Sequence, residues 1–137
     1  MSNSQVSLID FLNEGDVFAA HSGIQLTEIS KGKAVAQMTV GSNHLNAGGV
    51  CQGGVLFTLA DLAVAGVMNS RGKLTFSVQS SISFVRSATV GDRLTAEATE
   101  VNNHPKLPTI DVRIFNQDKQ LIATLTAIGY RKDKPIP

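Results

Sequence analysis

Six segments of the chain have strand character, either through alternation of hydrophobic and polar residues or through a run of β-prone residues. They span residues 24–30, 33–40, 76–84, 94–98, 110–114 and 121–130. Lys31-Gly32 lies between the first two segments, which are therefore expected to form a hairpin. The last four are expected to form an antiparallel meander.

The third segment alternates most regularly. Its apolar positions are separated mainly by Ser and Gln, and they are Phe76, Val78, Ile82 and Phe84. A period of two places such side chains on one face of a strand. We expect this face to be buried.

Residues 54–69 are apolar at nearly every position, so a helix here has almost no polar face to turn toward water. The sequence Asn69-Ser70-Arg71-Gly72 then supplies residues typical of a helix C-terminus. We expect a helix that other elements enclose on most sides. Its apolar run, about 14 residues long, is shorter than the ~20 residues that a membrane span needs.

These elements predict an α+β fold in which a curved, antiparallel, six-stranded sheet wraps around one long central helix. Residues 6–20 have an irregular helical spacing with a break at Gly15, which predicts short N-terminal helices. A length of 137 residues fits a single domain over residues 1–137. Within it, we expect an N-terminal helical segment at 1–22 and a flexible tail at 131–137.

The composition of the chain indicates which classes of partner and which cellular compartment to expect. Twelve Lys and Arg against eleven Asp and Glu give a net charge of +1, without the basic excess typical of nucleic-acid binding. Cys51 is the only cysteine, so no intrachain disulfide is possible and a reducing compartment fits. The first Lys or Arg is Lys31, so the N-terminus lacks the basic segment with which a signal peptide begins. We expect a cytoplasmic protein without nucleic-acid or membrane partners.

Asp61 is the first candidate for catalysis, because its carboxylate lies inside the apolar helix. Burial of an unpaired carboxylate is costly and shifts its pKa, a common property of general bases and nucleophiles. The plainer interpretation is that Asp61 lies on a polar stripe with Thr58 and bridges a neighbour.

Gly53-Gly54 opens the same helix, where backbone N–H groups have no partner within the helix. Glycine allows a carbonyl oxygen to approach these donors closely, as an oxyanion hole requires. A plain glycine-rich turn is the alternative. Phosphate binding is disfavoured, because the loop lacks the Gly-Lys-Ser/Thr ending of a P-loop and no dinucleotide fingerprint follows a strand.

Other catalytic chemistries have weaker support. Cys51, beside a helix N-terminus, is a second candidate nucleophile, although a small buried hydrophobe is the more common role of a lone cysteine. His21, His44 and His104 lie far apart without the spacing of metal ligands, so no metal is expected. No G-x-S-x-G motif is present.

Two motifs together resemble the hotdog-fold acyl-CoA thioesterases, specifically those of the phenylacetic-acid-degradation (PaaI-like) type. The first runs from Asn46 through Gly53-Gly54 to Asp61, and the second is the segment 84–92, FVRSATVGD. The resemblance covers residues 24–130. It implies a hotdog fold and hydrolysis of an acyl- or aryl-CoA thioester to a free acid and coenzyme A.

The resemblance also implies roles for individual residues. Asp61 would act as general base, or as a nucleophile through an anhydride, and the Gly53 N–H would polarise the thioester carbonyl. Asn46 would position the water or the carbonyl, and Ser77 matches a hydroxyl that assists the water in some relatives. Many relatives have His where this chain has Gln52, and Gln cannot carry a proton at neutral pH, so a positioning role is expected.

Substrate contacts are expected at Gly54, Ser77, Arg86 and Lys106, the last two toward the phosphates of coenzyme A. Coenzyme A would be part of the substrate, and no other cofactor is expected. Two alternatives stay open: a non-catalytic domain that binds or senses acyl-CoA, suggested by Gln52, and a hotdog hydratase or dehydratase. The hydratase would need a catalytic His, and no histidine is well placed.

Helix geometry predicts that the site is shared between two chains. Gly53 and Asp61 are eight residues apart, which is ~12 Å along a helix at ~1.5 Å per residue. One helix cannot easily place both groups on one thioester, whereas two antiparallel helices related by a twofold axis can. We expect a homodimer as the minimum unit, and a homotetramer by further association.

Overall fold

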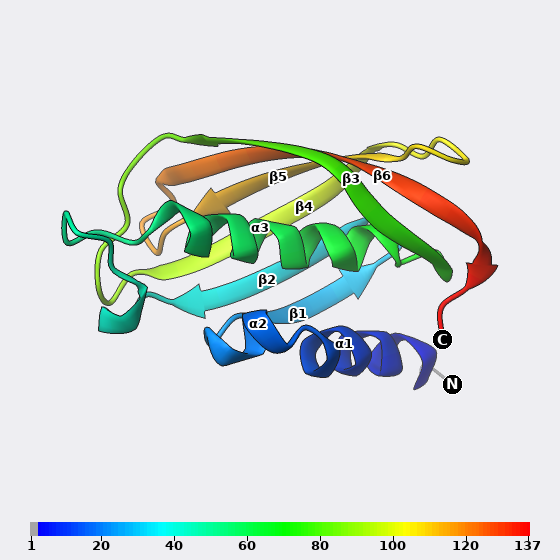
Figure 1. Ribbon diagram of the computed structural model, residues 1–137, viewed down its shortest axis with the longest axis horizontal. Helices are drawn as coiled ribbons and strands as arrows, with labels where there is room; N and C mark the ends of the chain where they lie inside the picture. Colours follow the sequence, from blue (N-terminus) through cyan, green and yellow to red (C-terminus); the bar gives the residue numbers. More distant parts are fainter. Residues whose placement is uncertain (1–2) are drawn as a thin grey trace.

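The computed structural model describes residues 3–137 as one curved sheet around a long helix, with two short helices at its lower edge in Figure 1. The helices and strands, in chain order, are α1 (Asn3–Gly15), α2 (Val17–His21), β1 (Gln25–Ser30), β2 (Lys33–Thr39), the short 3-10 helix η1 (Ser42–His44), α3 (Gly53–Met68), β3 (Lys73–Phe84), β4 (Arg93–Asn102), β5 (Thr109–Phe115) and β6 (Leu121–Pro135). The expectation of six strands around one central helix, preceded by short helices, is confirmed.

All pairings in the sheet are antiparallel, in the order β1-β2-β4-β5-β6-β3. The predicted hairpin of β1 and β2 is confirmed. The predicted four-strand meander is wrong at its first strand, because β3 pairs with β6 at the edge and β4 pairs with β2. The reason is that α3 crosses the concave face between β2 and β3 and carries the chain to the far edge of the sheet (Figure 1).

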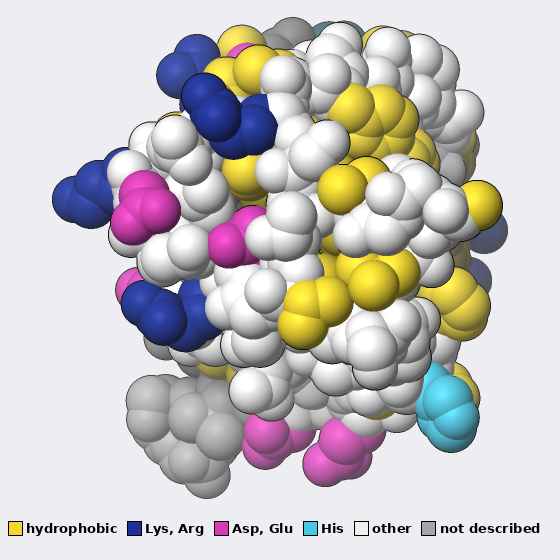
Figure 2. Space-filling view, turned by 90° about the vertical axis from the view of Figure 1, so that its left-hand side faces the viewer, with side chains coloured by type: hydrophobic (Ala, Val, Ile, Leu, Met, Phe, Trp, Pro, Cys, Tyr) yellow, Lys and Arg dark blue, Asp and Glu magenta, His cyan; other side chains and the backbone are white. Residues whose placement is uncertain are grey.

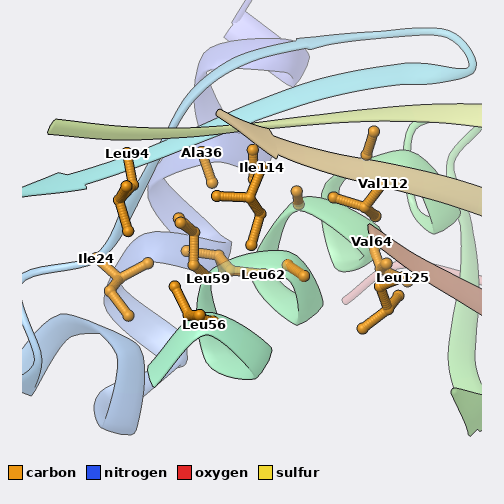
Figure 3. Packing of buried hydrophobic residues seen from close by; sticks show 14 of the residues in the cluster. Ile24, Ala36, Leu56, Leu59, Leu62, Val64, Leu94, Val112, Ile114 and Leu125 are labelled. Atoms are coloured by element: carbon orange, nitrogen blue, oxygen red, sulfur yellow. The ribbon is translucent and has the colours of Figure 1, made fainter. Parts of the chain in front are cut away.

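The core lies between α3 and the concave face of the sheet (Figure 3). Leu59, Leu62 and Val64 of α3 are fully buried there, as the apolar sequence of this helix predicts. At Gly66 the helix backbone approaches the sheet so closely that an added Cβ would lie 2.8 Å from the Cβ of Ala34. A larger residue at this position would therefore push α3 away from β2.

The expected buried face of β3 is a second correction. In the single chain the side chains of Phe76, Val78 and Phe84 are 51%, 60% and 56% exposed. A register shift between Ser77 and Gln79 marks a β-bulge at Val78, which reverses the alternation in the middle of the strand. The apolar positions therefore do not share one face, and β3 has a neighbour on one side only.

The expected flexible tail is wrong for residues 131–135, because β6 continues to Pro135. Arg131 pairs with Thr75 of β3 and is buried, and its guanidinium donates a hydrogen bond to Asn103 Oδ1 at 2.8 Å. The sequence around Arg131 predicts a tail because it is polar, but Arg131 belongs to the sheet. No helix in the described part of the chain is long and apolar enough to cross a membrane.

Candidate active site

The sheet leaves one stripe of α3 only half-buried, and Asp61 lies on it between Thr58 and Ala65. A cavity of about 330 Å³ opens beside this stripe, where α1 and β3 approach α3. Its lining includes Asp61 together with Ser77 of β3 and Phe11 of α1. The structure therefore brings two of the predicted site residues, Asp61 and Ser77, to one cavity that is otherwise largely apolar.

The environment of Asp61 makes its carboxylate more basic. Partial burial raises the pKa of Asp61 above its usual range, and the negative charge of Asp16 raises it further. No ion pair holds the Asp61 carboxylate within the described residues. The polar bridge considered from the sequence is therefore not formed within these residues, and the group is suited to accept a proton.

The N-terminus of α3 presents one free backbone donor. Gln52 is the N-cap residue, and its Oε1 accepts a hydrogen bond from the Gly54 N–H at 2.7 Å. The Gly54 donor is thereby occupied, whereas the Gly53 N–H donates to none of the described residues. Phe84 crosses close to this point, since a Cβ added to Gly53 would lie 2.9 Å from its ring. Glycine at 53 therefore permits the contact between β3 and the start of α3.

Asn46 shapes the loop that leads into α3. Its Oδ1 accepts hydrogen bonds from the N–H groups of Gly48 and Val50, at 2.9 and 3.2 Å. Its side-chain amide nitrogen donates to no residue between 3 and 137 and stays exposed. Asn46, Gly53 and Arg86 line a second cavity, of about 390 Å³.

The predicted site residues thus fall into two groups within one chain. The first cavity contains Asp61 and Ser77, and the second contains Asn46, Gly53 and Arg86. These two cavities share no lining residue, and along α3 they are separated by the ~12 Å between its N-terminus and Asp61. A single chain does not assemble the predicted donor and the predicted base around one substrate atom.

Lys106 lies with neither group. It belongs to the loop between β4 and β5, which is at the opposite end of the sheet from the start of α3 (Figure 1). The backbone of Lys106 fixes this loop, because its carbonyl accepts from the Arg131 N–H and its N–H donates to His104 Nδ1. A contact between Lys106 and coenzyme A stays a prediction.

The environment of Cys51 disfavours it as a nucleophile. The side chain is buried, and burial raises the pKa of its thiol to about 11, so the reactive thiolate is scarce at neutral pH. His44 is also buried, with Nδ1 bound by the Gly41 N–H and Nε2 at 2.8 Å from the Ser22 carbonyl oxygen. No cluster of three metal-ligating side chains occurs among the residues that the structure describes.

Sequence reasoning missed the contribution of the N-terminal helices. Phe11 and Leu12 line the cavity of Asp61, and the charge of Asp16 acts on its carboxylate. The amphipathic spacing around Phe11 predicts a helix but not the element against which it packs. Only the path of the chain in three dimensions places these residues beside the middle of α3.

A curved, antiparallel, six-stranded sheet around one long helix is the architecture of the hotdog fold. The family model of the thioesterase superfamily matches residues 48–123, which include Gly53 and Asp61, and the chain belongs to this superfamily.

The similarity to individual relatives and to solved structures extends beyond residues 48–123. The acyl-coenzyme A thioesterase PaaI of Escherichia coli is 35% identical over 118 residues, 86% of this chain and 84% of PaaI. The solved structure of the E. coli PaaI protein from the phenylacetic acid degradation operon superposes with a TM-score of 0.93 at 32% identity, covering 99% of both chains. A hypothetical thioesterase protein of Streptococcus pneumoniae, solved with coenzyme A, superposes with a TM-score of 0.78 at 26% identity, covering 82% of this chain and 91% of that chain. These similarities confirm the predicted PaaI-like resemblance and the prediction of a thioester hydrolase.

Proposed function

We propose that the protein hydrolyses acyl-CoA thioesters at a site formed by two copies of the chain. The observation that carries this proposal is the division of the site residues between two cavities. Gly53 offers an N–H that is unpaired within residues 3–137 in one cavity, and Asp61 offers a half-buried carboxylate in the other. An oxyanion donor and a base must both lie within ~3 Å of the reacting groups, or be linked to them through one water. Two antiparallel copies of α3 meet this requirement.

The exposed edge of the sheet supports the pairing of two chains. β3 is 12 residues long and pairs only with β6, which leaves a long unpaired edge. Phe76, Val78 and Phe84 on this strand are exposed in the single chain. Long apolar edge strands are normally covered, because they otherwise promote association. A twofold-related copy that packs along β3 covers this edge and brings its own Gly53 toward Asp61.

In the proposed reaction, the Gly53 N–H donates a hydrogen bond to the thioester carbonyl oxygen. Asp61 of the other chain accepts a proton from water, while the water oxygen bonds to the carbonyl carbon. Collapse of the tetrahedral intermediate then breaks the C–S bond, and the thiolate of coenzyme A leaves and takes up a proton. The raised pKa of Asp61 supports the role of base. Ser77 lines the same cavity, and its hydroxyl is assigned to hold the water.

Arg86 gives the second cavity a positive charge beside Gly53. An arginine there suits a phosphate of coenzyme A, because a guanidinium binds phosphate oxygens through two parallel hydrogen bonds. Figure 2 shows Lys and Arg side chains along one edge of this end of the molecule, with Asp and Glu side chains among them. The similarity to a thioesterase solved with coenzyme A supports this assignment.

Two variants of one residue test the oxyanion donor. Gly53→Pro removes the N–H but suits the first position of a helix, and Gln52 already has the extended backbone that a following proline requires (φ −67°, ψ 140°). Gly53→Ala keeps the N–H and introduces the same Cβ near Phe84. In a thiol-release assay with a panel of acyl-CoA substrates, we expect Gly53→Pro to lose ~100-fold or more in kcat relative to Gly53→Ala. Equal kcat values for Gly53→Pro and Gly53→Ala would refute the role of the Gly53 N–H as oxyanion donor.

The wild-type enzyme provides the broader test of the function. We expect it to release free thiol from at least one aryl or aliphatic acyl-CoA. Tight binding of acyl-CoA without thiol release would contradict hydrolysis and identify a sensing domain instead. A single turnover with excess enzyme in H₂¹⁸O distinguishes direct water attack, which labels the acid at once, from an anhydride that water opens at the Asp61 carbonyl, which first releases acid carrying an unlabelled Asp61 oxygen.

A further inference from the structure

A third cavity lies beside the Asp61 cavity, against α1 and α3. It measures about 410 Å³ and is lined by Gly15, Asp16, Val17 and Leu62, together with three residues that also line the Asp61 cavity. The shared residues are Phe11, Leu12 and Ala65. The two cavities are therefore adjacent. The three side chains that line both of them, Phe11 and Leu12 on α1 and Ala65 on α3, are called the wall below.

The chemistry of this wall suits an acyl group. All three side chains are apolar, and Leu12 packs against the hydrophobic core, so its position is fixed. Phe11 is held less tightly, being 44% exposed. The Asp61 cavity leads from the reacting carboxylate directly to this wall. An acyl chain that starts at Asp61 and runs along α3 toward α1 meets Phe11 and Leu12 first.

We propose that Phe11 and Leu12 of α1 form the end of the acyl pocket and set the length of the acyl group that the enzyme accepts. This inference rests on the proposed thioesterase function and adds a specificity-determining element to it. The occupant is the apolar acyl moiety of the substrate, not a separate ligand. Longer acyl groups are excluded by the wall, although a further cavity lies behind it.

Two substitutions within the wall, one that removes a side chain and one that enlarges it, should change the accepted acyl length in opposite directions. Phe11→Ala opens the passage into the third cavity, so each additional methylene becomes buried rather than excluded. Burial of one methylene contributes a factor of about four in affinity, so kcat/KM for each acyl-CoA beyond the wild-type optimum should rise by about fourfold per methylene. Ala65→Leu fills the passage and should shorten the optimum.

Phe18→Ala is the matched control. It removes the same side chain from the adjacent helix α2, where Phe18 is 70% exposed and lines neither cavity. Phe18→Ala should leave the chain-length profile of kcat/KM unchanged. A profile of Phe11→Ala that matches the profile of Phe18→Ala would overturn the proposal, and so would a lower dimer stability as the sole effect of Phe11→Ala.

A binding measurement separates this inference from the proposed hydrolysis. The dissociation constants of S-alkyl-CoA thioethers of increasing length are measured by calorimetry, which requires no turnover. A shift of the optimal length in Phe11→Ala but not in Phe18→Ala supports the wall even if the wild type released no thiol. Hydrolysis by the wild type with identical length profiles in both variants would refute the wall and leave the proposed function intact.

Discussion

Asp61→Asn is the most informative single substitution, because it changes a proton acceptor into a group of the same shape that accepts no proton. Loss of a general base lowers turnover by ~10²- to 10⁴-fold. We therefore expect kcat in the thiol-release assay to fall by at least ~100-fold. Asp118→Asn, in an exposed turn away from both cavities, is the matched control and should retain wild-type kcat.

The same substitution should leave the fold intact or stabilise it. The pKa of Asp61 is raised in the folded chain, which means that the ionised form is disfavoured there relative to the unfolded chain. The wild type therefore loses stability as the pH rises from the unfolded value near 3.8 through the raised folded value. At pH 7, Asp61→Asn should have an equal or higher Tm than the wild type, and this difference should disappear below pH ~4. Wild-type turnover in Asp61→Asn would refute Asp61 as base or nucleophile, and a fall in Tm at pH 7 would refute the account of its burial.

Further predictions concern three other residues. In a denaturant titration, Gln52→Ala should lower the free energy of unfolding by ~1 kcal/mol, because the Gly54 N–H loses its cap. In the thiol-release assay, Gln52→His should retain or raise kcat. A folded but inactive Gln52→His would contradict a positioning role. Burial is the main cause of the raised pKa of Asp61, and the charge of Asp16 adds to it. Asp16→Asn keeps an N-cap on α2 but removes this charge, so the acidic limb of the kcat/KM profile should move to lower pH. An unmoved limb would argue against this coupling. Cys51→Ala should keep wild-type kcat, because the thiol with a pKa of about 11 plays no part in the reaction, and inactivity of this variant would restore the nucleophile hypothesis.

The sequence predicts the elements well where local patterns decide the structure. The apolar run of α3 and the alternation in β4 and β5 are visible without any structure, and the described core contains these residues. The path of β3 is not predictable in this way, because its pairing with β6 depends on how α3 crosses the sheet. The bulge at Val78 likewise arises from pairing across strands rather than from local sequence.

The candidate site shows the same division between local and long-range information. Asp61 and Gly53 stand out because a carboxylate inside an apolar helix and a glycine pair at its start are local anomalies. Phe11 and Asp16 carry no such signal, since their proximity to Asp61 depends on the packing of α1 and α2 against α3. The local sequence places Arg131 in a polar tail, but Arg131 is buried because β6 pairs with β3.

Co-assembly of two inactive chains tests the shared site most directly. One chain has Asp61→Asn with an intact Gly53, and the other has Gly53→Pro with an intact Asp61. If each site combines Gly53 of one chain with Asp61 of the other, every mixed dimer contains one intact site out of two. Half of the dimers in an equal mixture are mixed, so unfolding and refolding the two chains together should restore about a quarter of wild-type thiol release. A site contained within one chain predicts no recovery, and that result would contradict the account.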